Sequence, residues 1–180
     1  VDGDRDLFGK EVAVLFQLEV DGKAVCVSDS SMEATQQGPI RQNDLQQGEV
    51  YDARLEGELS GWHGVKTEPN TLPITGMDTV PIREQEAFAG KLLRTPNGET
   101  VLDFGQNMAG YVEMKLTAHA GQKIKLLCGE ALDENGSFTQ ENFQDRNRHK
   151  EGGTVQLLEL VCKEGENHYK PSFTIMGFRY

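Results

Sequence analysis

Short stretches in which apolar and polar residues alternate recur along most of the chain. The clearest covers 12–20, where one face carries the apolar side chains Val12, Val14, Phe16, Leu18 and Val20. The other face is polar, so the pattern predicts a half-buried β-strand. Asp21 and Gly22 follow as a two-residue hairpin signal, and 23–28 is predicted to return as the partner strand.

Similar stretches predict further strands, separated by turn signals every 8–12 residues or so. They lie near 48–55, 82–93, 100–102, 111–116, 123–128, 154–162 and 173–175. The turn signals between them include Asn97-Gly98, 120–122, and Asn135-Gly136 in the polar loop 129–142. The stretch 154–162 is apolar on both faces, which is typical of a central strand in a sandwich. No helical period is evident, so we expect an all-β antiparallel sandwich.

Two regions are predicted to be irregular. The stretch 28–38 is polar, and 57–81 is rich in glycine and proline without a sustained period. The second region contains Trp62, the only tryptophan. An indole can stack on a sugar ring, but a tryptophan packed within a linker is the favoured interpretation.

The segment 103–110 is the most distinctive polar stretch between two apolar ones. It contains Asp103, Gln106 and Asn107 and includes two glycines. Glycine suits sharp turns and close backbone approach, and Asp and Asn side chains bond neighbouring backbone. A structured corner between strands is therefore favoured, with a ligand-binding loop as the alternative.

Composition limits the partners. The chain has 29 acidic residues against 18 Lys and Arg, for a net charge of -11. This charge argues against nucleic acid and against an anionic membrane surface, because both require a basic face. No apolar run approaches the roughly 20 residues needed to cross a bilayer. We therefore expect a soluble protein, whose charge is compatible with a neutral or cationic ligand.

The three cysteines do not form a recognisable framework. Cys26, Cys128 and Cys162 are widely spaced, odd in number and contain no C-x-x-C pair. Each lies in an apolar stretch, so we expect buried free thiols rather than disulfides or a zinc site. Free thiols favour a reducing, cytoplasmic compartment.

The chain starts with Val1 and stops within strand-like sequence at Tyr180, which suggests a piece of a longer protein. Near the start, Asp2, Asp4 and Asp6 resemble the opening of a calcium loop. Such a loop needs Gly and then Glu at later positions, where this chain has Leu7 and Ala13. A charged segment is favoured over a calcium site.

Other candidate chemistry is weak. Glycoside hydrolysis needs two carboxyls across a sugar ring, and Glu84 with Glu86 or Glu130 with Asp133 are close in sequence. Solvated surface acids are the favoured reading, because acids are rarely buried. The histidines have no ligand-like spacing: His63, His119, His149 and His168. Neither a nucleophile elbow nor a phosphate loop occurs. We therefore predict no metal and no cofactor.

Three segments taken in order resemble one enzyme family. They are 103–110 (DFGQNMAG), 129–136 (GEALDENG) and 169–180, which ends in GFRY. Their order and spacing resemble the non-catalytic, concanavalin-like β-sandwich of bacterial α-L-rhamnosidases, inverting glycosidases that release terminal rhamnose. Upstream, 48–54 (GEVYDAR) resembles the end of the preceding N-terminal β-domain.

The resemblance implies the organisation of the chain. Residues 1–66 would be the C-terminal part of an N-terminal β-sandwich domain, and 67–180 the concanavalin-like domain. In the family a helical (α/α)6 barrel follows and holds the catalytic carboxylates. No part of this sequence resembles the barrel, so we expect an inactive accessory region that packs against the barrel and positions it. The barrel would be its partner within the parent chain.

Contact with a rhamnoside, or with another plant or bacterial glycan, is a secondary expectation. The candidates for such contact are Trp62, Asp103, Gln106, Asn107 and Glu130. Packing and corner roles are favoured for all of them, because function occupies few sites on a fold. Two alternatives stay open: a stand-alone carbohydrate-binding module and a self-contained glycosidase.

Overall fold

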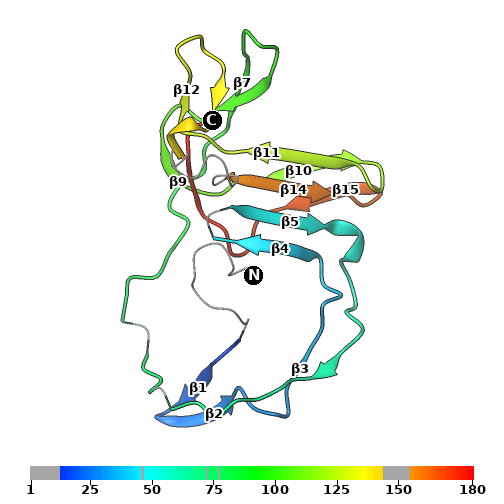
Figure 1. Ribbon diagram of the computed structural model, residues 1–180, viewed down its shortest axis with the longest axis vertical. Coiled ribbons are helices and arrows are strands. Elements are labelled where there is room, and N and C mark those ends of the chain that lie inside the picture. The colour runs from blue at the N-terminus through cyan, green and yellow to red at the C-terminus, as the bar shows by residue number, and fades with distance from the viewer. Residues whose placement is uncertain (1–12, 46, 72, 77, 144–154) are drawn as a thin grey trace. The chain divides into compact units, whose positions relative to one another are not determined.

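The computed structural model describes residues 13–45, 47–71, 73–76, 78–143 and 155–180 (Figure 1). Its chain divides into two compact units. Unit 1 contains Pro39–Glu56 and Glu86–Tyr180, and the described part of unit 2 contains 13–38 and 57–85. Each unit is therefore built from two stretches of the chain, and the second stretch of unit 2 lies between the two stretches of unit 1 in sequence.

A four-stranded sheet is the largest element of unit 1, with the order β11-β14-β5-β4. Its strands are β4 (Ile40–Asp44), β5 (Gly48–Asp52), β11 (Lys123–Leu127) and β14 (Leu157–Val161). In β14, Leu158 and Leu160 are each only 1% exposed. The prediction of a central strand here is confirmed. β5 pairs with β14 in parallel, whereas the other strand pairs among the described residues are antiparallel.

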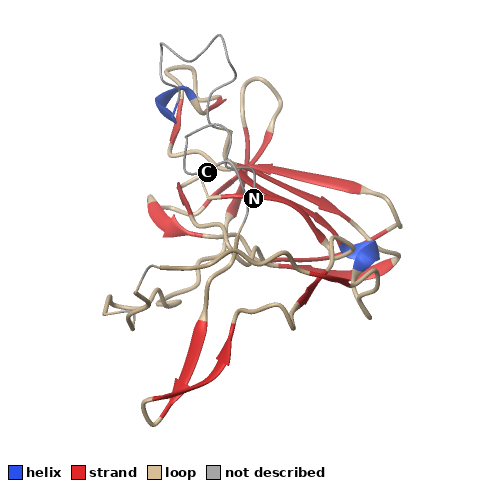
Figure 2. Ribbon diagram, turned by 60° about the horizontal axis from the view of Figure 1, so that its bottom comes forward, coloured by secondary structure: helices blue, strands red, loops and turns tan. Residues whose placement is uncertain are grey.

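The remaining strands of unit 1 form short antiparallel pairs. The pairs are β10 (Met114–Ala118) with β15 (Gly165–Tyr169), β9 (Met108–Gly110) with β16 (Met176–Phe178), β7 (Lys91–Arg94) with β8 (Thr100–Asp103), and β12 (Ala131–Leu132) with β13 (Phe138–Thr139). Two single 3₁₀ turns, η1 (Ala53–Leu55) and η2 (Glu141–Phe143), complete the unit. The segments drawn as helix in Figure 2 are these two short turns, and the described residues contain no α-helix, which confirms the all-β class.

The core of unit 1 collects side chains from most of these strands. Its buried members are Ala53, Ala118, Cys128, Leu158, Leu160, Cys162, Tyr169, Met176 and Phe178. The rings of Phe104 and Phe178 meet edge to face with 5.5 Å between centroids. Such contiguous apolar burial supplies the main driving force for the fold.

A buried carboxylate ties β5 into this core. Glu49 is 2% exposed, and its Oε1 accepts a hydrogen bond of 2.9 Å from the Tyr169 hydroxyl. The amide of Asn43 donates to Glu49 Oε2 and to Thr174 Oγ1, both at 3.0 Å. Burial of a charge is tolerated only when such donors replace water. The network therefore fixes the β4–β5 hairpin to the segment around Tyr169.

Unit 2 consists of two small strand pairs. They are β1 (Gln17–Val20) with β2 (Lys23–Val27), and β3 (Glu33–Ala34) with β6 (His63–Gly64). Asp21 and Gly22 join β1 to β2 with φ of 50° and 73°, the positive values that a type I′ hairpin turn needs. This turn was predicted. Apart from β6, the described part of 57–81 contains no strand, as expected.

Several predicted details are wrong. Strand β1 begins only at Gln17, and Leu18 and Val20 are 54% and 52% exposed rather than half-buried. None of the described residues of unit 2 is buried, so the apolar face has no core to enter. Cys26 is likewise exposed, whereas Cys128 and Cys162 are buried as predicted.

Other errors concern strand positions in unit 1. The segment 173–175 is not a strand, because Thr174 turns inward to its hydrogen bond with Asn43 and β16 starts only at Met176. Within 82–93 the only strand residues belong to β7. The polar strands β4 and β15 were not predicted.

The predicted boundary between residues 66 and 67 stays a prediction. The structure adds that Gly48–Asp52, placed in the first domain by the sequence, pairs with Leu157–Val161 of the second. The two expected domains thus share one sheet.

Replacing Tyr169 by Phe tests the buried network. The change removes the donor to Glu49 Oε1, and a buried charged acceptor that loses a donor costs about 1–3 kcal/mol of unfolding free energy. Urea unfolding measures the loss. Tyr51→Phe is the matched control, since its hydroxyl bonds the exposed Glu56 and its ring lies 5.4 Å from that of Tyr169. Equal effects of the two substitutions would contradict a special role for Glu49.

Candidate functional site

The corner 103–110 connects β8 to β9. Asp103 ends β8, and its Oδ1 accepts a hydrogen bond of 2.7 Å from the backbone N–H of Gly105. Gly105 has a φ of 83°, a conformation that glycine adopts without a steric penalty. The side chain of Asp103 thus closes a local turn of the kind that Asp favours.

Arg179 holds the same carboxylate from 76 positions away in the chain. Its Nε donates to Oδ1 at 2.9 Å and its Nη2 to Oδ2 at 3.0 Å. The backbone adds a third bond, from the Phe104 N–H to the Arg179 carbonyl at 3.0 Å. Such two-pronged pairing favours the charged form of the acid. The Arg179 hydrogen bonds, with that from Gly105, lower the pKa of Asp103 to about 2.

A second polar group lies at the far end of the corner. Asn107 Nδ2 donates to Glu130 Oε1 at 3.3 Å, and Asn142 Nδ2 donates to Glu130 Oε2 at 2.6 Å. Glu130 also lies against Gly177, where an added Cβ would come within 3.1 Å of Oε1. The carboxylate therefore links three chain segments. Gln106 is exposed at the tip of the corner.

The structure brings only part of the predicted set together. Asn107 and Glu130 are in contact, and Asp103 is held by Arg179, a residue that sequence reasoning quoted in a motif but did not place at the site. Trp62 belongs to unit 2, where it is 48% exposed and donates its indole N–H to the Leu59 carbonyl at 3.1 Å.

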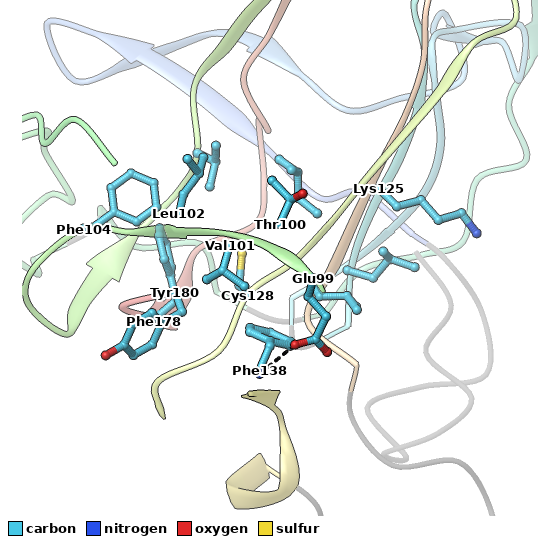
Figure 3. A pocket seen from close by; sticks show the side chains of 14 residues that line it. Glu99, Thr100, Val101, Leu102, Phe104, Lys125, Cys128, Phe138, Phe178 and Tyr180 are labelled. Atoms are coloured by element: carbon cyan, nitrogen blue, oxygen red, sulfur yellow. Dashed lines mark hydrogen bonds between the residues drawn. The ribbon is translucent and has the colours of Figure 1, made fainter. Parts of the chain in front are cut away.

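Unit 1 also contains a cavity of about 480 Å³ (Figure 3). Its lining is mostly apolar: Val101, Leu102, Phe104, Val112, Leu126, Leu127, Cys128, Phe138, Leu157, Phe178 and Tyr180, with Glu99, Thr100 and Lys125. Sequence reasoning did not identify it, because its walls come from strands distant in sequence. Volume and lining are typical of small-molecule sites and of gaps between packed sheets.

The acid in the cavity wall is bonded within the protein. Glu99 is the only acid among the described residues that line it. Its Oε2 accepts hydrogen bonds from Thr95 Oγ1 at 2.6 Å and from the Phe138 N–H at 3.1 Å. Burial raises the pKa of the Cys128 thiol to about 12, so it is not a nucleophilic thiolate. The cavity thus lacks a pair of facing carboxylates among its described lining residues.

The other acids suggested by sequence spacing do not converge on a cleft. Asp133 Oδ1 accepts from the backbone N–H groups of Asn135 and Ser137, which closes the β12–β13 turn. Glu84 and Glu86 are exposed in a segment without strand structure.

The histidines do not gather into a metal site in the part of the chain that the structure describes. His119 and His168 pair with exposed acids, while His149 and the Asp2–Asp6 motif lie outside the described residues. No group of three or more His, Cys, Asp or Glu in the described part could hold a metal ion. The described helices are too short to cross a membrane.

Two family models match the chain. "Alpha-L-rhamnosidase N-terminal domain" matches residues 1–98, and "Bacterial alpha-L-rhamnosidase concanavalin-like domain" matches residues 93–180. Together they cover the whole sequence.

Full-length relatives agree with these matches. An alpha-L-rhamnosidase from Formosa agariphila is 31% identical over 99% of this chain and 20% of its own length. One from Streptomyces avermitilis is 33% identical over 96% of this chain and 18% of its own length. The chain thus spans about a fifth of the curated relatives it matches.

Solved structures show the same similarity. The alpha-L-rhamnosidase structure from Dictyoglumus thermophilum has a TM-score of 0.69 at 30% identity, over 88% of this chain and 18% of that one. The crystal structure from Aspergillus terreus has a TM-score of 0.63 at 27% identity, over 89% of this chain and 19% of that one.

Substituting Asp103 by Asn tests the role of the Arg179 pair. Because the folded pKa lies below the ordinary value of about 3.9, the pair stabilises the fold above that value and is lost as pH falls toward about 2. Both side chains are partly exposed, so we expect Asp103→Asn to cost about 1 kcal/mol at pH 6 and almost nothing near pH 2.

Urea unfolding midpoints at several pH values measure this difference. Glu134→Gln, a change of an exposed acid in the β12–β13 turn, is the charge-matched control and should behave as the parent chain does. A penalty for Asp103→Asn that is the same at pH 2 and pH 6 would refute the ion-pair account.

Proposed function

Since the chain belongs to the bacterial α-L-rhamnosidase family, we propose that it is an accessory β-region of such an enzyme. The full-length protein hydrolyses terminal α-L-rhamnose from glycosides, and its catalytic carboxylates lie on a helical barrel outside these 180 residues. This region packs against the barrel and positions it. Its free cysteines suit a cytoplasmic protein.

One observation carries the proposal: the acids of unit 1 brace the fold. A glycosidase needs a general acid whose pKa is raised by its surroundings. The pKa of Asp103 is lowered instead, and that of Glu159 is lowered by hydrogen bonds from Lys123 and Lys125. Acids held as anions in this way stabilise structure but donate protons poorly.

Three further acids support the same conclusion. Glu49, Glu99 and Glu130 each accept hydrogen bonds from groups that belong to other segments of unit 1. A carboxylate that joins two segments is not free to approach and retreat from a substrate. These contacts support a scaffolding role.

Direct contact with sugar is a narrower proposal, and it is based on which of the candidate side chains are exposed to solvent. Trp62 and Gln106 present accessible side chains, whereas Asp103, Asn107 and Glu130 are engaged within the protein. Of these two accessible side chains, only the indole of Trp62 can stack on a pyranose. A stand-alone carbohydrate-binding module would need a broader aromatic platform than one tryptophan provides.

The 180-residue chain is expected not to hydrolyse 4-nitrophenyl α-L-rhamnoside. The reason is that Asp103 and Glu159 have lowered pKa values, and that Glu49, Glu99 and Glu130 are bonded within the fold. Release of nitrophenol, followed by absorbance over hours, is the measurement. The full-length parent enzyme is the positive control, and turnover by the 180-residue chain at a rate lost on Asp103→Asn or Glu130→Gln would overturn the accessory role.

Trp62 allows a direct test of sugar contact, because it is the only fluorophore of its type in the chain. Rhamnose at millimolar concentration is expected to leave its emission unchanged, with no heat of binding in calorimetry. A saturable heat of rhamnose binding that disappears in Trp62→Phe but persists in Gln106→Ala would instead support a binding module centred on the indole.

A further inference from the structure

The cavity of unit 1 lies between two strand edges. Its lining includes residues 100–102 of β8 and residues 125–127 of β11, which are consecutive in each strand. Within the part of the chain that the structure describes, β8 pairs only with β7, and β11 pairs only with β14 at the edge of the four-stranded sheet. We call the part of the cavity between these two edges the slot.

Both strands direct backbone groups into the slot. In a ladder, alternate residues turn their N–H and C=O groups to the same edge. The Glu99 carbonyl accepts a bond of 3.2 Å from the Thr95 N–H on the β7 side, and the Cys128 N–H donates at 2.9 Å to the Gln156 carbonyl on the β14 side. The intervening residues therefore direct their backbone groups into the slot: Thr100, Leu102, Lys125 and Leu127.

The segment 179–180 already lies between the two strands at one end of the slot. The N–H of Phe104, immediately after β8, donates to the Arg179 carbonyl at 3.0 Å. On the other side Gly129 and Tyr180 exchange two backbone hydrogen bonds, of 2.9 and 2.8 Å. The gap at this end is thus one strand wide. Figure 3 shows Phe104 and Tyr180 at the same end of the cavity.

The backbone at Tyr180 leads into the slot. The paired bonds between Gly129 and Tyr180 are typical of antiparallel strands. Since β8 and β11 both end beside the segment 179–180, an extended chain that continues past Tyr180 runs back along both of them. It passes first between Leu102 and Leu127, whose backbone groups face it.

We propose that the slot holds one further strand, formed by the residues that directly follow Tyr180 in the parent rhamnosidase and antiparallel to both β8 and β11. Relatives are long enough to supply it, since this chain covers only 20% and 18% of two of them. The side chains that this strand turns into the cavity are apolar, to match the lining. The strand would complete unit 1 whatever role unit 1 has in the enzyme.

The filled slot explains how the β7–β8 pair is stabilised. A two-stranded hairpin alone is marginal in water. The added strand joins it to the larger sheet, in the order β7-β8-added strand-β11-β14-β5-β4. A small molecule would not pair the backbone groups of both edges as a strand does. A second copy would compete with a segment that is covalently held at the slot, at an effective concentration on the order of millimolar.

Hydrogen exchange in the full-length parent, followed by mass spectrometry at residue resolution, tests this assignment. Prolines at the second and fourth positions after Tyr180 remove N–H donors from the proposed strand. We expect the N–H groups of Leu102 and Leu127 to exchange at least about tenfold faster in this variant than in the parent. Those of Val101 and Leu126, which face β7 and β14, are internal references and should change by less than about threefold.

Alanine at the same two positions is the matched control, because it retains the donors. It should leave exchange at Leu102 and Leu127 within about threefold of the parent. Equal exchange in the parent and in the proline variant would overturn the assignment, as would rapid exchange of Leu102 and Leu127 in the parent itself.

The 180-residue chain allows a second measurement that does not require the proline variant to fold. A peptide with the sequence of the ten residues after Tyr180 in the parent should slow exchange at Leu102 and Leu127 saturably, and the same peptide with the two prolines should not. Equal effects of the two peptides would contradict the proposal. Protection in the chain alone that rises with protein concentration would identify a second copy as the occupant and would also overturn it.

Discussion

The parallel pairing of β5 with β14 is the interaction on which unit 1 depends. It places an early segment of the chain beside the most deeply buried strand. The pairing also positions β4 and η1, because both adjoin β5 in the sequence. The free-energy cost of burying Glu49 is offset by the hydrogen bonds that Tyr169 and Asn43 donate to it. The pairing is therefore specific as well as apolar. The pairing also joins the two family models, since β5 lies within residues 1–98 and β14 within 93–180.

Several other acids of unit 1 also stabilise this fold through hydrogen bonds. The Asp103–Arg179 pair joins the end of β8 to the C-terminal segment, and Glu130 joins the corner to η2. In each case donors from a distant segment satisfy the carboxylate in place of water, and for Asp103 these bonds lower its pKa. Glycoside hydrolysis instead requires at least one carboxyl group whose pKa is raised. The same residues that make the family recognisable in the sequence are therefore best understood as parts of its scaffold.

Sequence reasoning succeeded where local chemistry decides structure. The Asp21-Gly22 and Asn97-Gly98 turns and the central position of β14 were predicted, because turn residues and two-sided apolar runs are local signals. It failed where tertiary contacts decide. The sequences of β4 and β15 are polar and show no apolar alternation. β15 also depends on contacts remote in sequence, such as the bond between Tyr169 and Glu49, which are 120 positions apart. The corner was predicted, whereas its partner Arg179 and the apolar cavity were not.

The central claim is that the acids of this region support the fold and not the chemistry. Steady-state kinetics of the full-length parent enzyme carrying Asp103→Asn or Glu130→Gln tests it most directly, with the folded fraction measured on each sample. The account predicts a kcat per folded molecule within about twofold of the parent, together with lower stability. Loss of about a hundredfold or more in kcat with unchanged stability, the size expected for a general acid or base, would contradict it.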